Sequence, residues 1–476
     1  MTQNKTKGLY PRIIISAASS GSGKTLVTMG LIRAFLSQGK GVQSFKIGPD
    51  YIDTGFHHLC AKKPCYNLDT VLMGKKGVSQ TLLAYSKPGV LSIIEGVMGL
   101  YDGKSPQGEG STAEIAILTQ TPVLVVLNAK AMAQTAGALA LGIMKYNQQC
   151  PVAGFILNHL GSEAHYEIVK EAVEKATGLP VVGWLAKING PLFPERHLGL
   201  VAAWEFGDSA SPDHPVNRAE QISDHMQNRF DFEQIKAIAQ RAGEYQSISN
   251  NKNTVPEIMI KTPKTSIALA LDDAFHFYYQ ENLDMLEEWG IQWKAFSPIK
   301  SPDLPQGIGG IYLGGGYPEN HAASLEANLN MKQAILNKAK QNMPIWAECG
   351  GLMYLASKLL IQERSYNMAG LFDLTIKMEK QLSALGYYQA TLMEDTILGP
   401  AGFEATGHMF RWSQIIQEPE KPRPLFKVTK NNKTSFEGYI YKNTVASYLH
   451  LHFAGAPQIA ANFLKTCRAF EKGEMP

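Results

Sequence analysis

Short runs of β-branched and aliphatic residues alternate with helical patterns from residue 12 to about residue 200. The runs are Ile13 to Ile15, Val42 to Lys46, Leu91 to Ile94, Val123 to Leu127 and Val152 to Leu157. Most of them are apolar without interruption, which is typical of strands that are buried on both faces. Such strands, separated by helices, predict a parallel sheet with helices on both sides.

A second series of apolar runs begins after a polar stretch that has no periodicity. Its strands are expected at Ser266 to Leu271, Ile311 to Leu313 and Met343 to Ala347. The polar stretch has Ser247 to Asn253 at its centre and indicates a linker. We therefore expect two α/β domains, residues 1–240 and 265–476, with a linker over residues 241–264.

The composition, with 45% hydrophobic and 18% charged residues, is that of a folded globular protein. The 45 basic and 42 acidic residues give a net charge of +3, too small to indicate binding to nucleic acid or an anionic membrane. The five cysteines form no CxxC pair and are typical of reduced thiols. The most apolar stretch, Val123 to Met144, is interrupted by polar residues, so no membrane span is expected. We expect a soluble cytoplasmic protein that acts on small molecules.

A phosphate-binding loop is predicted directly after the first strand. Residues Ala18 to Thr25 match G-x-x-x-x-G-K-[ST] except that Ala18 replaces the first glycine, and a helix is expected over Leu26 to Leu36. Backbone N–H groups of such a loop bind phosphates, Lys24 reaches the transferring phosphate, and Thr25 helps to hold Mg²⁺. The expected nucleotide-binding residues are Ser20, Gly21, Ser22, Gly23, Lys24 and Thr25.

Acidic residues follow the second and third strands. Asp50 and Asp53 follow the second strand, and Glu95 and Asp102 follow the third. Ligands bind at the carboxyl ends of parallel strands, so these acids are expected near the phosphates. Glu95 ends its strand opposite the loop and is predicted to bind a metal ion. Asn158 ends a later strand, where it either contacts the nucleotide base or acts as a cap.

Cys349 occupies a position that suits a nucleophile. The run Ile345 to Ala347 predicts a buried strand, and Gly350 and Gly351 begin a helix, so the cysteine lies at a tight turn. N–H groups at a helix start favour thiolate over thiol, and flanking glycines let a substrate approach the backbone. The alternative is a structural cysteine buried in the core.

A thiolate nucleophile needs a base and an oxyanion hole. Near the C-terminus, His450 and His452 alternate with apolar residues and are expected on one face of an extended segment. Either one is a candidate partner for Cys349. Gly315 and Gly316 follow a predicted strand, where their N–H groups either hold an oxyanion or form an ordinary tight turn.

Eight motifs, taken in order, resemble those of the cobyrinic acid a,c-diamide synthases, glutamine-dependent amidotransferases of corrinoid biosynthesis. The resemblance covers essentially the whole chain. The motifs are SSGSGKT, KIGPDYIDTGFH, EG-x-MGLYDG, PERHLGL, DDAFHFYY, LGGGYPE, AECGGLMYL and SYLHLHF.

The resemblance implies a two-domain enzyme of the α/β class. The first domain is similar to the dethiobiotin synthetase ATPases and would use ATP and Mg²⁺ to phosphorylate a carboxylate of the macrocycle. The second resembles the class I glutamine amidotransferase fold. By this resemblance Cys349 is the nucleophile, His450 raises its reactivity, and His452 is a neighbour of the base.

The resemblance also assigns roles to the acidic residues. Glu95 is expected to bind Mg²⁺ together with Thr25 and Asp50, while the division of roles among Asp50, Asp53 and Asp102 stays open. The positions that match the family's substrate-facing or phosphate-facing residues are Asp50, Tyr51, Ile52, Asp53, Asp69 and Asp102. Two departures from the family pattern are Ala18 in the loop and the pair Met409 and Arg411, where the family more often has Glu and His.

The reaction implied by the resemblance is amidation of the a and c carboxylates of cobyrinate in cobalamin biosynthesis. An acyl phosphate would react with ammonia released from L-glutamine. Nickel sirohydrochlorin and hydrogenobyrinate are alternative substrates. A partitioning or regulatory P-loop ATPase is an alternative of another class, but it would need neither Cys349 nor His450 and would carry a basic surface. No nucleic-acid or membrane partner is expected, and a homo-oligomer stays open.

Overall fold

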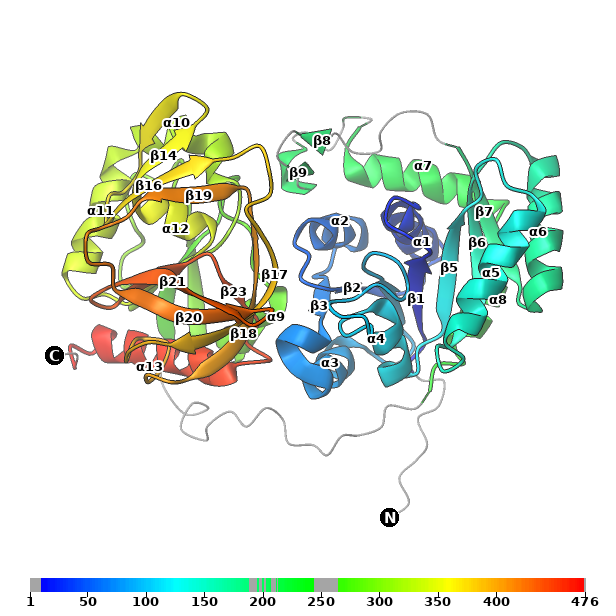
Figure 1. Cartoon of the computed structure of the whole chain (residues 1–476), viewed down its shortest axis with the longest axis horizontal. Coiled ribbons are helices and arrows are strands. Elements are labelled where there is room, and N and C mark those ends of the chain that lie inside the picture. Colours follow the sequence, from blue (N-terminus) through cyan, green and yellow to red (C-terminus); the bar gives the residue numbers. More distant parts are fainter. Residues whose placement is uncertain are drawn as a thin grey trace, which may run out of the picture. The chain divides into compact units, whose positions relative to one another are not determined.

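The chain forms two compact units, Met1–Asn250 and Asn251–Pro476 (Figure 1). A computed structural model describes residues 10–187, 195–196, 199–200, 203–206, 211, 213–243 and 264–474. Most of the predicted linker, residues 244–263, lies outside the described residues, as do residues 194, 197 and 198 of the PERHLGL motif. None of the described helices is long and apolar enough to cross a membrane.

The first unit is built on a parallel seven-stranded sheet with the order β3-β2-β4-β1-β5-β6-β7. Its strands are β1 Arg12–Ala17, β2 Val42–Ile47, β3 Tyr66–Leu68, β4 Leu91–Glu95, β5 Val123–Asn128, β6 Val152–Leu160 and β7 Val181–Ala186. The five predicted strands are present, and sequence reasoning missed β3 and β7. A separate two-stranded sheet pairs β8 Glu195–Arg196 with β9 Gly199–Leu200.

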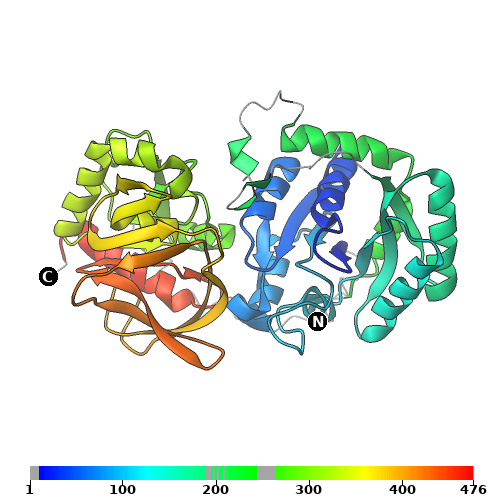
Figure 2. The same cartoon turned by 45° about the horizontal axis from the view of Figure 1, so that its top comes forward.

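Helices cover both faces of this sheet (Figures 1 and 2). The helices of the unit are α1 Lys24–Ser37, α2 Ile52–Ala61, α3 Thr70–Tyr85, α4 Thr112–Thr119, α5 Gln134–Tyr146, α6 Glu163–Thr177, α7 Pro215–Gln227 and α8 Phe232–Ala239, with a 3₁₀ turn η1 at Ala203–Glu205. Right-handed crossovers put α1 and α2 on one face and α3 to α6 on the other. The predicted arrangement of a parallel sheet between helical layers is confirmed.

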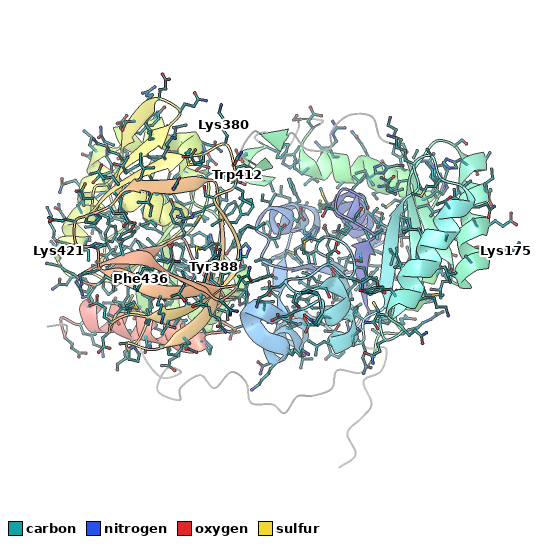
Figure 3. The ribbon with its side chains drawn as sticks, viewed as in Figure 1. Lys175, Lys380, Tyr388, Trp412, Lys421 and Phe436 are labelled. Atoms are coloured by element: carbon teal, nitrogen blue, oxygen red, sulfur yellow. The ribbon has the colours of Figure 1, made fainter. Side chains whose placement is uncertain are left out.

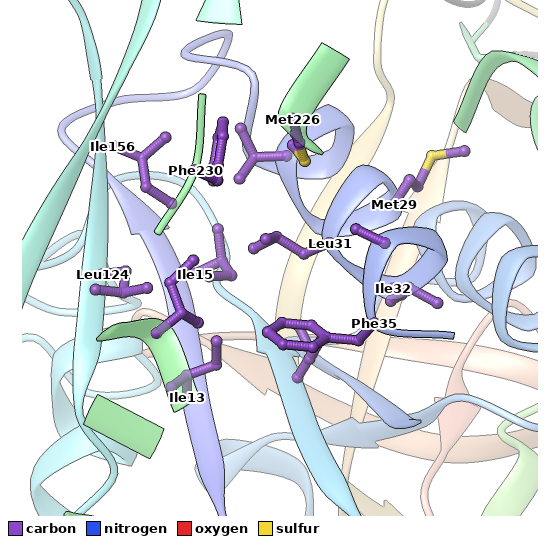
Figure 4. Packing of buried hydrophobic residues seen from close by; sticks show 14 of the residues in the cluster. Ile13, Ile15, Met29, Leu31, Ile32, Phe35, Leu124, Ile156, Met226 and Phe230 are labelled. Carbon is purple, nitrogen blue, oxygen red and sulfur yellow. The ribbon is translucent and has the colours of Figure 1, made fainter. Parts of the chain in front are cut away.

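The core on the α1 face is packed from alternate residues of the central strand. Ile13 and Ile15 of β1 are fully buried beneath Leu31 and Phe35 of α1, and Phe230, just after α7, closes the cluster (Figure 4). Burial of a side chain of this size contributes roughly 1.5–3 kcal/mol. This packing fixes where β1 ends and α1 begins, and therefore where the loop between them lies.

The second unit is built on a ten-stranded mixed sheet with the order β11-β10-β12-β13-β22-β21-β20-β17-β18-β23. Its first five strands are parallel and the rest pair antiparallel. The strands are β10 Thr265–Ala270, β11 Ile291–Phe296, β12 Gly310–Leu313, β13 Ile345–Glu348, β17 Ala384–Leu392, β18 Glu404–Arg411, β20 Pro424–Lys430, β21 Lys433–Tyr441, β22 Thr444–Ser447 and β23 His450–Leu451.

A four-stranded sheet and several helices complete this unit. The sheet is formed by β14 Ala356–Ile361, β15 Arg364–Asn367, β16 Phe372–Met378 and β19 Ser413–Gln417. The helices are α9 Gln280–Glu288, η3 Pro318–His321, α10 Ala322–Ala327, α11 Leu329–Lys340, α12 Gly350–Leu355 and α13 Pro457–Glu471. The three predicted strands are β10, β12 and β13. The antiparallel half of the large sheet was not predicted.

Candidate active site

The phosphate loop leaves β1 at Ala17 and returns as α1 at Lys24. Gly21 and Gly23 have φ angles of +74° and +93°, a region that glycine adopts without strain. Ala18 does not adopt a positive φ, so its Cβ causes no backbone strain of this kind. The start of α1 presents N–H groups of the kind that bind phosphate.

Asn158 holds this loop from β6. Its Nδ2 donates to the carbonyl oxygen of Ser22 at 2.9 Å, and its Oδ1 accepts the N–H of His159 at 2.9 Å. A Cβ on Gly23 would lie 2.2 Å from Nδ2 of Asn158, so the pair fits only with glycine. The Asn158 side chain is 1% exposed. These contacts favour the interpretation that Asn158 holds the loop in place, rather than the alternative that it contacts a nucleotide base.

Lys24 is folded across the loop toward the segment after β4. Its Nζ donates to the carbonyl oxygens of Met98 at 2.6 Å and Ser19 at 3.3 Å. Burial, together with the positive charge of Lys46, lowers the pKa of Lys24. An anionic phosphate would offer the ammonium a stronger partner than two neutral carbonyl groups.

Glu95 is the centre of a buried polar network at the end of β4. Its Oε1 accepts from the Thr25 hydroxyl at 2.7 Å and from Lys46 at 2.9 Å, and its Oε2 lies 2.7 Å from Nε2 of His57. Burial favours the neutral acid, but Lys46 and His57 outweigh it and hold the pKa of Glu95 well below its usual value. Burial opposes the charged form of His57, yet its hydrogen bonds to Cys65 and Glu95 raise its pKa to about 10.

Asp53 belongs to the same network, whereas Asp50 supports the backbone. Oδ2 of Asp53 accepts from Lys46 at 2.6 Å. Burial and the charge of Asp50 raise the pKa of Asp53 to about 7, although Lys46 opposes the shift. Oδ1 of Asp50 accepts the N–H groups of Ile52 and Asp53 at 2.8 Å each and so caps α2, with Tyr51 at the N-cap position.

Asp69 and Asp102, the two remaining acidic residues that match the family pattern, also accept hydrogen bonds from backbone N–H groups. Oδ1 of Asp69 caps α3 through Val71 at 2.8 Å and Leu72 at 3.0 Å, and the side chain is 1% exposed. Oδ2 of Asp102 accepts the N–H of Gly99 at 2.9 Å. The capping of α3 is sufficient to explain why an acidic residue is found at Asp69, without a contact to substrate. For Asp102, a substrate-facing role stays a prediction.

Thr25 and Glu95 fit a nucleotide-bound Mg²⁺. Hydroxyl and carboxylate oxygens are its preferred protein ligands, and at nucleotide sites one or two of them act together with phosphate oxygens. The two oxygens lie 2.7 Å apart beside the loop. In the described part of the chain no group of three or more His, Cys, Asp or Glu is arranged to hold a metal ion. Asp50, also predicted as a ligand, uses one oxygen to cap α2.

Cys349 lies at a strained turn between β13 and α12. Its φ and ψ are +50° and −102°, a conformation that costs a non-glycine residue about 1–3 kcal/mol. The backbone N–H of Cys349 donates to the carbonyl oxygen of Ser447 at 2.7 Å, which holds the turn in place. Such strain at a strand-to-helix turn is typical of nucleophile positions.

The electrostatics of Cys349 differ from the sequence-based expectation. A cysteine at a helix start is expected to have a lowered pKa. Instead, burial and the charge of Glu319 raise the pKa of Cys349 to about 12, although the N–H of Gly350 and the charge of Arg411 act in the opposite direction. The free protein therefore holds a neutral thiol, and the sulfur attacks only if a base takes its proton.

His450 lies next to the turn that carries Cys349. Oε1 of Glu348, the residue before the thiol, accepts the N–H of Leu451, the residue after the imidazole, at 3.2 Å. His450 is directly opposite His408 in the antiparallel pair of β18 and β23. Burial and the charge of His408 lower the pKa of His450 to about 3, so the imidazole is neutral in the free protein.

His452 has different surroundings. The strand β23 ends at Leu451, so the predicted alternation does not continue through His452. Its ring packs against Tyr279 with centroids 4.7 Å apart, and its Nε2 lies 3.7 Å from Oε2 of Glu281. The pairing of His450 rather than His452 with the thiol is therefore the better interpretation.

The two predicted oxyanion glycines have different roles. The N–H of Gly315 donates to the carbonyl oxygen of Phe277 at 3.3 Å, so its role as an oxyanion donor stays a prediction. A Cβ on Gly315 would lie 2.6 Å from Cε1 of His450, so this glycine makes room for the imidazole. The backbone nitrogen of Gly316 is 3.2 Å from the Cβ position of Gly350 and faces the nucleophile turn.

Comparisons with known proteins place both sites in one family. The CobQ/CobB/MinD/ParA nucleotide binding domain matches residues 13–189, and the CobB/CobQ-like glutamine amidotransferase domain matches residues 266–458. A cobyrinate a,c-diamide synthase of Dehalococcoides mccartyi is 41% identical over 469 residues, which cover 97% of this chain and 99% of the relative.

The chain belongs to the cobyrinate a,c-diamide synthase family.

Two further members have similar levels of identity. The synthase of Leptospira interrogans is 38% identical over 96% of this chain and 98% of its own length, and that of Listeria monocytogenes is 39% identical over 93% and 96%. The predicted family and fold class are confirmed, as is the prediction of a ligase that uses glutamine as its amide donor.

Four residues of these cobyrinate a,c-diamide synthase sites were missed by sequence reasoning. Lys46 lies in the buried strand β2 and Glu348 ends the buried strand β13, and these positions were a usable signal because Lys and Glu are almost never fully buried without a partner. His57 and His408 gave no such signal. Their contacts depend on how α2 meets β4 and on how β18 pairs with β23.

Proposed function

We propose that the protein amidates the a and c carboxylates of cobyrinate in cobalamin biosynthesis, using ATP and L-glutamine. The observation that carries the proposal is a strained Cys349 turn joined by hydrogen bonds to the segment of His450, in a chain that also holds a phosphate loop. Relatives that bear the name cobyrinate a,c-diamide synthase support the choice of substrate. The reaction takes place in the cytoplasm.

The first unit activates the carboxylate. The loop residues Ser20 to Thr25 bind the nucleotide phosphates, and Lys24 exchanges the Met98 carbonyl oxygen for a phosphate oxygen. Attack of the substrate carboxylate on the γ-phosphorus gives an acyl phosphate and ADP. The carboxylate oxygen, a poor leaving group, thereby becomes a good one. Mg²⁺ held by Thr25 and Glu95 would neutralise phosphate charge.

Lys46 and Asp53 position the groups around the transferring phosphate. Lys46 is held between Glu95 and Asp53, and its two carboxylate partners together raise its pKa despite burial. It therefore stays charged throughout the reaction and keeps Glu95 in place beside Thr25. The roles of Asp50, Tyr51, Ile52 and Asp102 toward the substrate are proposals that rest on the family resemblance.

The second unit releases ammonia from glutamine. His450 accepts the proton of the Cys349 thiol as the sulfur attacks the amide carbon of glutamine. Collapse of the tetrahedral intermediate breaks the carbon–nitrogen bond, and the proton passes to the leaving ammonia. Water then hydrolyses the thioester to glutamate. In the glutaminase step, the N–H groups of Gly316 and Gly350 hold the oxyanion of the tetrahedral intermediate. The released ammonia then displaces phosphate from the acyl phosphate of the substrate and forms the amide.

An amidation assay with a panel of tetrapyrroles tests this proposal. The panel contains cobyrinate, hydrogenobyrinate and nickel sirohydrochlorin, each supplied with ATP, Mg²⁺ and glutamine. The mass of each product is measured by mass spectrometry. We expect two amide substitutions on cobyrinate and the highest kcat/KM for it. Preferred amidation of either other macrocycle would leave the mechanism in place but overturn the substrate assignment. Absence of ATP-dependent amidation of all three would overturn the proposal itself.

A further inference from the structure

Arg411, at the end of β18, has a guanidinium group that lacks an acidic partner. Its Nε and Nη1 atoms are buried, and no hydrogen-bond partner for either occurs among the described residues. A buried donor without a partner costs about 1–3 kcal/mol, and more when the group is charged. No ion pair within 4.0 Å joins Arg411 to a described carboxylate. An anion from outside the protein chain would remove this cost.

The guanidinium is anchored beside the glutaminase thiol. It stacks on the ring of Tyr448 with 4.2 Å between Cζ and the ring centroid. The Tyr448 hydroxyl is 2.8 Å from the Ser413 hydroxyl, which fixes the ring. Tyr448 directly follows Ser447, whose carbonyl oxygen accepts the N–H of Cys349. Arg411 is therefore positioned through the same segment that holds the nucleophile.

One nearby acid, Glu437, offsets part of this charge but forms no ion pair within 4.0 Å with Arg411. Glu437 is the nearest candidate by charge, since Arg411 opposes the rise in the pKa of Glu437 that burial causes. However, Oε1 of Glu437 accepts the backbone N–H of Tyr448 at 2.7 Å. Tyr388, on the neighbouring strand β17, and Trp412, directly after Arg411, lie at the same side of this unit (Figure 3). Among the described residues the guanidinium thus contacts the ring of Tyr448, and Tyr388 lies close enough for the charge of Arg411 to act on it.

We propose that Arg411 binds the α-carboxylate of the glutamine whose side-chain amide reaches Cys349. This rests on the proposed glutaminase function. Glutamine carries its carboxylate at the far end from the amide, together with an α-ammonium group. Pro318, next to Glu319, has its Cδ 3.1 Å from the Cβ position of Gly350 in the nucleophile turn. The charges of Glu319 and Arg411 act on Cys349 with opposite signs. A zwitterion matches this pair of charges, whereas a simple carboxylate such as a macrocycle side chain would meet Arg411 but be repelled by Glu319.

The test uses the full-length protein, L-glutamine, and L-glutaminamide, which lacks the α-carboxylate. Glutaminase activity is measured for the wild type, Arg411→Gln and Arg411→Lys. Losing charge-assisted hydrogen bonds to the carboxylate is expected to lower kcat/KM for glutamine about 10- to 100-fold in Arg411→Gln, mainly through KM. Activity toward L-glutaminamide, already low in the wild type, is expected to stay unchanged. Arg411→Lys is expected to restore part of the preference for glutamine.

The matched control is Arg423→Gln. Arg423 lies in the same unit and pairs with Glu394 at the surface, where ion pairs contribute little. An equal loss with both substrates in Arg411→Gln would make Arg411 merely structural and overturn the proposal. No loss with either substrate would overturn it as well. If the wild type lacks a glutaminase that depends on Cys349, the proposed function fails instead, so the two failures are distinguishable.

Discussion

The backbone N–H of Cys349 donates to the carbonyl oxygen of Ser447 at 2.7 Å. This bond joins the nucleophile turn to the end of β22, three residues before His450. A second bond, from the N–H of Leu451 to Oε1 of Glu348, joins the two segments again on the other side. The segments that carry the thiol and the imidazole are thus joined by one backbone–backbone bond and by one bond from a backbone N–H to the Glu348 side chain.

We predict that Cys349→Ala abolishes amidation with glutamine but not with added ammonium salt. The variant has no sulfur to form the thioester, while carboxylate activation in the other unit is untouched. The expected loss of glutamine-dependent activity is about a thousandfold or more. The measurement is product formation with each nitrogen source in parallel. Full glutamine-dependent activity in the variant would show that Cys349 is not the nucleophile.

Gly315→Ala is predicted to impair the glutaminase through His450. The added Cβ would lie 2.6 Å from Cε1 and 3.2 Å from Nε2 of the imidazole, so the ring must shift. A displacement of about 1 Å at a reacting group costs on the order of 100-fold in rate. Glutaminase kcat should fall by about that factor, while ammonium-dependent amidation and the melting temperature of the first unit stay near the wild-type values. Wild-type kcat in this variant would mean that His450 is not the base.

The fold of both units follows from the sequence largely because their parallel strands are continuous apolar runs. The antiparallel strands β17 to β21 were missed because many of their residues are exposed or half-buried without regular alternation, and Phe436 is one exposed example. Cys349 was recognisable from local glycines and strand pattern. The raised pKa of its thiol was not, because it comes from burial and from Glu319, which lies outside the local motif.

Lys24→Ala is predicted to abolish amidation with either nitrogen source. The ammonium supplies a positive charge to the transferring phosphate, and removing one such group typically costs on the order of 100- to 1000-fold. The glutaminase reaction, measured alone as glutamate release, should persist, because Lys24 belongs to the first unit. Unimpaired amidation by this variant would contradict the acyl-phosphate scheme.

The buried pair of His57 and Glu95 is predicted to make stability depend on pH above neutrality. The pKa of His57 is about 10 in the folded protein and 6.5 for a histidine exposed in an unfolded chain, so the folded state binds the extra proton between these values. The contribution of His57 to the free energy of unfolding is therefore fully present below pH 6.5 and is lost as the pH rises toward 10. This contribution is a few kcal/mol at most. Calorimetric melting of wild type and His57→Gln from about pH 6 to about pH 10 measures it. The wild type should lose more stability over this range than the variant, and parallel curves would show that His57 is neutral in the folded protein.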